Sequence, residues 1–210
     1  MWWHHFLDQW HGVSFWLYPS LSPATDLEVS SDAAGSLGFG AFFKSQWFYG
    51  SWAISQQSQS IAYKELFPVA IAAFVWGPQW CKRHVLFRSD DAVVHMLNSR
   101  TSKILCLMRL LRHLLLSAAC HSFSFLTQHV PGVNNQLADA LSRFHWQEFH
   151  QLAPDAQPLP TPIPPQLLTQ GLASCIPLPD TGSCSFHSQI VHFSSEEVHQ
   201  FLSSAGQAPC

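Results

Sequence analysis

The sequence lacks a hydrophobic run long enough to cross a lipid bilayer. Its most apolar stretch, Ile104–Ala119, is shorter than the roughly 20 residues that a spanning helix needs, and it contains Arg109, Arg112 and His113. The first residues also lack the basic region and the small-residue cleavage site of a secretory signal. We therefore expect an intracellular protein, cytoplasmic or nuclear, that has no membrane partner.

Metal-binding spacings of cysteine and histidine are absent as well. The six cysteines show no Cys-x-x-Cys spacing and the thirteen histidines no His-x-x-x-His spacing, with His4 and His5 as the one adjacent pair. These absences argue against a disulfide framework, a structural zinc site and a metal-storage role. The nine tryptophans could stack on nucleobases, but their positions favour the core and the N-terminal connector.

An excess of positive charge is missing from the whole chain, whose formal net charge is -3. The distribution nevertheless favours a nucleic-acid partner. All ten Lys and Arg residues lie between Lys44 and Arg143, where residues 26–145 contain seven acids, a difference of ten minus seven, or +3. If four of these acids bind metal, the remaining surface is basic, as binding to a phosphate backbone requires.

Composition divides the chain into four zones. Residues 1–25 are rich in aromatic side chains and are interpreted as a connector, whereas residues 26–145 alternate between strand and helix patterns and predict one domain. Residues 146–180 hold eight of the fourteen prolines and predict an extended linker. Residues 181–210 form a C-terminal tail, in which Ser194 and the acids after it predict a short helix.

The pattern within residues 26–145 predicts the order βββαβααβα and hence the α/β class. The first three strands read as an antiparallel meander, and strands joined through helices are parallel partners, so we expect a mixed five-stranded sheet flanked by helices. The expected strands span residues 27–33, 39–44, 47–54, 84–87 and 122–129, and the expected helices residues 60–76, 91–98, 102–118 and 135–143.

Four carboxylates are the candidate metal ligands of this domain. Asp32 lies late in the first strand, Glu65 on the first long helix, Asp90 after the fourth strand and Asp139 on the last helix. Each has an ordinary alternative role, as a turn residue, a solvated helix charge, the neighbour of a helix cap or a polar helix edge. Together they offer the hard oxygen ligands, from different elements, that a pair of Mg²⁺ ions needs.

The four acids lie in short sequence segments that follow one another in a characteristic order. These segments and their order resemble the ribonuclease H family, in the version carried by retrotransposon polyproteins of the DIRS and Gypsy type. The resemblance covers residues 26–145. The last segment is the most specific, because a strand, a His-x-Pro-Gly loop and an Asn lead to an Ala-Asp pair on a helix. The segments are Ser31–Gly35, Gly38–Ala41, Lys64–Leu66, Ser89–Val94 and His129–Arg143.

The resemblance implies a ribonuclease H-like fold and an endonuclease that hydrolyses the RNA strand of RNA–DNA hybrids. In the family the matched acids Asp32, Glu65, Asp90 and Asp139 bind two Mg²⁺ ions, for which Mn²⁺ can substitute. The matched His129 assists proton transfer or product release, although by itself it would be interpreted as a strand-end histidine satisfied by hydrogen bonds. The implied partners are an RNA–DNA hybrid and an upstream reverse transcriptase domain.

The chain departs from the family pattern in a few places. Ala34 stands where many relatives have Ser and Asp91 where Asn is frequent, but neither is a matched metal ligand. The basic loop that some cellular relatives insert near the long helix is absent, so we expect low substrate affinity from this chain alone. No polymerase Tyr-x-Asp-Asp motif occurs, and we expect a fragment of a polyprotein or a separate reading frame.

Two other functions remain open at this point. A decayed or domesticated element could keep the fold as an inactive module that binds nucleic acid or protein, although all four matched acids are present. A DNA-cutting relative such as an integrase or resolvase could share the fold, but such enzymes lack the segment from His129 to Asp139. Cleavage of a labelled hybrid, compared with duplex DNA and with an Asp32→Asn variant, distinguishes the three.

Overall fold

The computed structural model describes residues 27–89 and 91–169. The predicted connector (1–25) and tail (181–210) lie outside the described residues. The strands are β1 Glu28–Ala33, β2 Gly38–Phe43, β3 Gln46–Ser51, β4 His84–Ser89 and β5 Ser124–His129; the helices are α2 Ile54–Gln57, α3 Ile61–Trp76, α4 Asp91–Ser99, α5 Leu105–Cys120, α6 Gln136–Ser142, α7 Trp146–Leu152 and α8 Pro165–Thr169, with the 3-10 helices η3 Gly77–Trp80 and η4 Gly132–Asn134.

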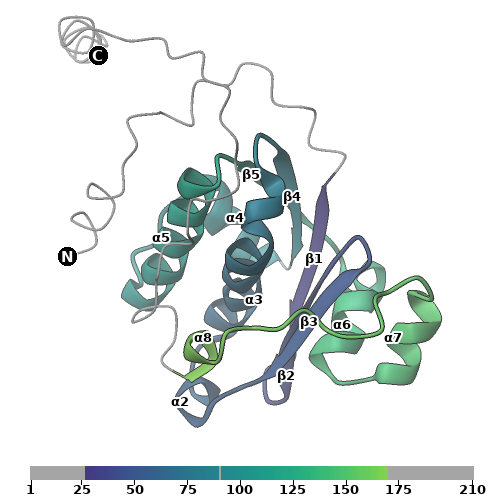
Figure 1. The fold of residues 1–210 in the computed structure, drawn as a ribbon. Helices are drawn as coiled ribbons and strands as arrows, with labels where there is room; N and C mark the ends of the chain where they lie inside the picture. Colours follow the sequence, from purple (N-terminus) through teal and green to yellow (C-terminus); the bar gives the residue numbers. More distant parts are fainter. Residues whose placement is uncertain (1–26, 90, 170–210) are drawn as a thin grey trace, which may run out of the picture. The chain divides into compact units, whose positions relative to one another are not determined.

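The strands form one mixed sheet in the order β3-β2-β1-β4-β5, with helices on both faces (Figure 1). β1 pairs antiparallel with β2, and β2 antiparallel with β3, whereas β1 is parallel to β4 and β4 to β5. The predicted fold class, a mixed five-stranded sheet flanked by helices, is confirmed. Because β1, β4 and β5 are parallel, their carboxyl ends meet at one edge of the sheet, where α/β proteins commonly place their functional groups.

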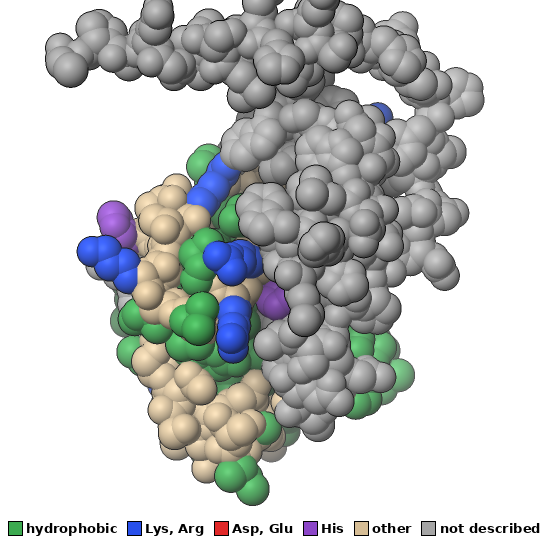
Figure 2. Space-filling model, turned by 90° about the vertical axis from the view of Figure 1, so that its left-hand side faces the viewer, with side chains coloured by type: hydrophobic (Ala, Val, Ile, Leu, Met, Phe, Trp, Pro, Cys, Tyr) green, Lys and Arg blue, Asp and Glu red, His purple; other side chains and the backbone are tan. Residues whose placement is uncertain are grey.

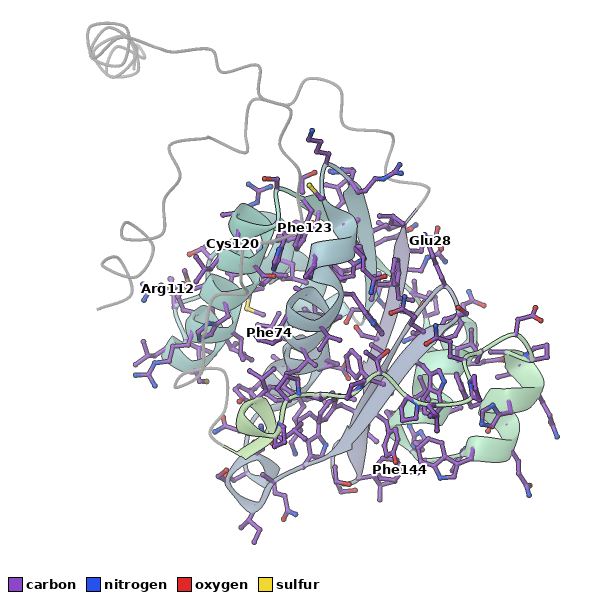
Figure 3. The ribbon with its side chains drawn as sticks, viewed as in Figure 1. Glu28, Phe74, Arg112, Cys120, Phe123 and Phe144 are labelled. Atoms are coloured by element: carbon purple, nitrogen blue, oxygen red, sulfur yellow. The ribbon has the colours of Figure 1, made fainter. Side chains whose placement is uncertain are left out.

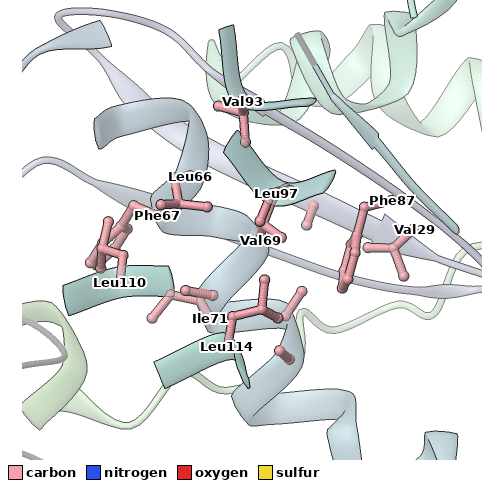
Figure 4. Packing of buried hydrophobic residues seen from close by; sticks show 14 of the residues in the cluster. Val29, Leu66, Phe67, Val69, Ile71, Phe87, Val93, Leu97, Leu110 and Leu114 are labelled. Carbon is pink, nitrogen blue, oxygen red and sulfur yellow. The ribbon is translucent and has the colours of Figure 1, made fainter. Parts of the chain in front are cut away.

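One face of the sheet packs against α3, α4 and α5. Alternation along β1 turns Val29 and Ala33 to this face, and both are buried in the larger hydrophobic core. Figure 4 shows Val29 beside Phe87 of β4, with the apolar side chains of α3 and α5 on the same side. Among residues 27–89 and 91–169, no helix is long and apolar enough to span a membrane.

The opposite face of the sheet packs against α6 and α7 (Figure 1). A second, smaller core lies here, and its fully buried members include Leu141 of α6 and Phe149 of α7. Trp47 of β3 is 4% exposed and its ring is tilted against that of Phe149, with 5.0 Å between ring centroids. Helix α7 was not predicted, because its short apolar pattern stands directly before the run of prolines.

Residues 153–164, here called the strap, run along the outer strand β3 (Figure 1). The Gln157 N–H donates to the Ser45 carbonyl at 2.8 Å and the Thr161 N–H to the Trp47 carbonyl at 2.7 Å. In return, Trp47 Nε1 donates to the Gln157 carbonyl at 2.7 Å. The strap therefore satisfies backbone groups of an edge strand that would otherwise face solvent.

The strap leads into α8, whose Leu167 is 1% exposed in the larger core. Residues 146–169 thus differ from the predicted linker, since they contain two helices and pack against the sheet. The physical reason is that a run of prolines disfavours a central strand or a helix interior but permits an extended segment beside a sheet edge. Residues 170–180 of the predicted linker lie outside the described residues.

Candidate functional site

Two of the predicted carboxylates, Asp32 and Asp139, come together beside α6. Ser142 Oγ donates to Asp32 Oδ2 at 2.6 Å across 110 positions of sequence, and the same hydroxyl lies 3.0 Å from the Asp139 carbonyl oxygen. Arg143 Nε donates to Asp139 Oδ1 at 2.7 Å. One turn of α6 therefore presents Asp139 next to the half-buried Asp32 of β1.

Helix α6 is held against β1 at both of its ends. At its start, Asn135 Nδ2 donates to the Ser31 carbonyl at 2.9 Å, in a bond whose partners are 104 positions apart. At its last residue, Ser142 holds the Asp32 carboxylate. Two fixed points define the direction of a helix, so these bonds set where Asp139 lies relative to β1.

A glycine allows helix α6 to lie close to the sheet. Gly40 of β2 pairs with Asp32 across the antiparallel ladder. A Cβ at Gly40 would lie 2.4 Å from Leu141 Cβ and 3.2 Å from the Ser142 backbone nitrogen. The absence of a side chain at this position therefore allows α6 to rest directly on the sheet beside Asp32.

Replacing Gly40 with Ala is expected to destabilise the protein by about 1 to 3 kcal/mol, because an added methyl group must displace the α6 backbone. Urea unfolding measures this change. The control is Gly35→Ala, since an added Cβ there meets nothing within 4 Å. Equal stabilities of the two variants would contradict the role given to Gly40.

The electrostatics of Asp32 are those of a crowded acidic site. Burial raises the pKa of the Asp32 carboxyl above its ordinary value, and the negative charge of Asp139 acts in the same direction. The hydrogen bond from Ser142, the charge of Arg143 and the Ala33 backbone act against this rise in pKa. A cation that binds between two such carboxylates would remove their mutual repulsion.

Glu65 lies deep between α3 and the rest of the fold, with 4% of its surface exposed. Figure 4 places Leu66 and Val69 of α3 beside Val93 and Leu97 of α4. Glu65 therefore lies on the part of α3 that packs near the beginning of α4. Its position excludes the alternative interpretation as a solvated helix charge.

Lys64, the residue before Glu65, is also buried and joins two backbone segments by hydrogen bonds. Its Nζ donates to the backbone carbonyls of Gly35 and Gln57. Gly35 belongs to the turn between β1 and β2, which begins two residues after Asp32. Lys64 thereby fixes this turn against the start of α3.

His129 lies at the carboxyl end of β5, where its side chain is exposed. The parallel register pairs His129 with Ser89, the last residue of β4. Asp90, predicted as a metal ligand, follows Ser89 in sequence and lies outside the described residues. Among the described residues, no three His, Cys, Asp or Glu side chains lie close enough to hold one metal ion.

Several buried oxygens at this edge lack hydrogen-bond partners among the described residues. They are Ser31 Oγ, Ser89 Oγ and Asn135 Oδ1, on side chains that are 0%, 0% and 6% exposed. Buried polar atoms normally have a partner, often a water or an ion. Separately from these oxygens, Asp32 and Asp139 supply carboxylate oxygens, which are the hard donors that Mg²⁺ prefers, so these two residues fit that ion.

Three positioning residues were not predicted from the sequence. Ser142 carries a signal, since it lies three positions after Asp139 and therefore on the same helix face. Gly40 and Asn135 lie in matched segments, but the segments do not reveal their positioning roles, because these depend on partners in β1 and α6 that are far away in sequence.

A basic and apolar face lies over α5 (Figure 2). Its exposed members include Lys103, Arg109 and Arg112, interleaved with Ile104 and Leu105, which are 55% and 61% exposed. Among the described residues, Figure 2 shows no Asp or Glu on this face. Three of the ten Lys and Arg side chains therefore lie on this face.

Comparisons with known proteins give a distant structural likeness. No family model matches this chain, and no curated protein matches it. Among solved structures, the chain is similar to RNase H1 from the halophilic archaeon Halobacterium salinarum NRC-1, with 16% identity and a TM-score of 0.44. The likeness covers 58% of this chain and 98% of that chain.

Proposed function

We propose that this chain is a metal-dependent endonuclease of the ribonuclease H type, which hydrolyses the RNA strand of RNA–DNA hybrids. The observation that carries the proposal is the juxtaposition of Asp32 and Asp139, held by Ser142 across 110 positions of sequence. Supporting it are the buried Glu65 and the sequence segment from His129 to Arg143.

The proposed ligands of two Mg²⁺ ions are Asp32, Glu65, Asp90 and Asp139, and Mn²⁺ can substitute. Two such ions supply activation of a water nucleophile and stabilisation of the leaving oxygen. The hard carboxylate oxygens suit this role, and burial raises the pKa of the Asp32 carboxyl among them. The proposed contribution of the chain is to hold these oxygens at one edge of the sheet before substrate arrives.

The neighbouring side chains have separate proposed roles. Ser142 orients the Asp32 carboxylate by donating to Oδ2. Arg143 is 48% exposed beside Asp139, so its guanidinium can also contact a substrate phosphate. His129, exposed at the end of β5, is proposed to accept or deliver a proton as product leaves.

We further propose that the domain derives from a retrotransposon reverse transcriptase, with an upstream polymerase domain as its partner. The support is the order of the matched segments, above all His129–Arg143. The basic face of α5 is a complementary surface for the acidic backbone of the hybrid.

The full chain is expected to cut a labelled RNA–DNA hybrid in Mg²⁺ or Mn²⁺ and to leave duplex DNA intact. Ca²⁺ is expected to support binding with little turnover, because the reaction needs compact octahedral geometry. Gel analysis of the products, with EDTA as the metal-free control, measures this. Binding of the hybrid without cleavage in any metal would instead favour an inactive nucleic-acid module.

A further inference from the structure

Three half-exposed aromatic side chains form a cluster outside the carboxylate pair. Tyr49 of β3, Phe144 after α6 and Trp146 of α7, here called the aromatic platform, each contact the other two. Their ring centroids are 4.5 Å apart for Tyr49 and Trp146, 5.7 Å for Phe144 and Trp146, and 5.9 Å for Tyr49 and Phe144. Tyr49 is 38% exposed, and it is stacked at 6.0 Å on the buried Trp47.

The strand register places the platform in line with the candidate site. Asp32 pairs with Gly40, and Gly40 pairs with Tyr49, so the three residues form one row across β1, β2 and β3. Paired residues of antiparallel strands turn to the same face, and two strand spacings amount to roughly 10 Å. Gly40 has no side chain between the carboxylate and the tyrosine ring, and Leu141 fills that place.

Phe144 lies at the same end of the sheet. Figure 3 shows Phe144 at the end opposite Glu28, the first residue of β1. Its ring covers Gly38, where an added Cβ would lie 2.5 Å from the ring. The platform is therefore at the carboxyl end of β1, as are Asp32 and the turn that follows it.

The backbone of Phe144 is unusual for an aromatic residue. Its φ is 63°, in the left-handed region. The Phe144 N–H bonds the Leu141 carbonyl and the His145 N–H bonds the Ala140 carbonyl, which is the helix end where glycine is the common residue. A bulky ring at this position is disfavoured locally, so contacts of the ring must hold it there.

Charged groups around the platform favour an anionic ligand on one side. Arg143, with 48% of its side chain exposed, precedes Phe144 directly. On the α7 side, Glu148 is paired with His145 at 3.2 Å. A ligand with an aromatic ring and a nearby negative charge matches the rings together with Arg143.

We propose that the aromatic platform binds an unpaired nucleobase of a substrate strand that runs past the carboxylate pair, an inference that rests on the proposed nuclease function. Exposed aromatic rings stack on nucleobases of any sequence. Bases inside a duplex are already stacked on each other, so the platform selects a single-stranded extension or a displaced base. Arg143 contacts the phosphate of that nucleotide.

The test compares a blunt hybrid with two extended hybrids. One carries a single-stranded extension on its RNA strand and the other on its DNA strand. Affinity for the full chain is measured in Ca²⁺, where cleavage does not interfere. Wild type is expected to bind the extended hybrid more tightly, and Tyr49→Leu to lose roughly tenfold of that preference. Tyr49→Phe keeps the ring and is expected to keep the preference.

Leu152→Ala is the matched control, because it removes a 42% exposed apolar side chain from α7, the same helix as Trp146. Unfolding curves of Tyr49→Leu and of a second variant, Trp146→Leu, show whether each is folded. If folded variants retain the preference for the extended hybrid, the three rings only cover the edge of the smaller core. That result overturns the proposal.

The outcome is separable from that of the proposed function. A wild type that cuts hybrids but binds blunt and extended forms equally overturns the platform and leaves the nuclease proposal standing. A wild type that prefers the extension through Tyr49 but never cuts supports the platform and overturns the nuclease proposal.

Discussion

Asp32→Asn is expected to lower the rate of hybrid cleavage by roughly 100-fold or more, since a neutral amide replaces a proposed metal ligand at the centre of the site. Asp139→Asn is expected to have an effect of the same order. Initial rates on the labelled hybrid in Mg²⁺ measure both losses. Because the carboxylates repel each other, neither variant is expected to unfold the domain.

Two further variants sharpen this prediction. Asp155→Asn makes the same chemical change at an exposed surface position and is expected to leave the rate unchanged. Ser142→Ala keeps both carboxylates but removes the bond that orients Asp32, and about a tenfold loss is expected. If Asp32→Asn and Asp155→Asn were equally active, Asp32 would have no catalytic role.

A chain that ends at residue 145, the predicted domain boundary, is expected to be largely unfolded. It would lose α7, the strap and α8, and with them the fully buried Phe149 and the 1% exposed Leu167. Removing side chains of this kind from a core costs about 2 to 5 kcal/mol each, and a domain has about 5 to 15 kcal/mol in total. A chain that ends at Thr169 is expected to unfold cooperatively in circular dichroism.

Point variants of the full chain test the same contacts without truncation. Leu167→Ala is expected to lower the free energy of unfolding by about 2 to 5 kcal/mol. Leu159→Ala, in the strap but 75% exposed, is expected to change it by less than about 0.5 kcal/mol. Similar values for the two would show that α8 does not contribute to the core.

The sheet was predictable because its signals are local. Alternation along β1 and β2 and the apolar spacing of α3 depend on neighbouring residues, and the observed bounds differ from the expected ones by a few residues. Helix α5 begins at Leu105 instead of Ser102. The strap was not predictable, because its hydrogen bonds are made to β3, far away in sequence.

The candidate site also has a part that was predictable from the sequence and a part that was not. The encounter of Asp32 with Asp139 followed from the matched segments, and the structure brings these two together. Gly40 and Asn135 lie in matched segments, but their positioning roles could not be recognised, because a close helix approach and a bond to a distant carbonyl depend on the tertiary structure. The convergence of Glu65 and Asp90 on the same metal pair stays a prediction.

The double attachment of α6 to β1 has a consequence for synthesis on the ribosome. Its two bonds join residues 104 and 110 positions apart, and the bond between Trp47 and Gln157 spans 110 positions. The first strand must therefore wait for most of the domain to be translated before it gains these partners. Contacts of such long range slow folding, so the nascent sheet is expected to need protection from aggregation until Leu167 has left the exit tunnel.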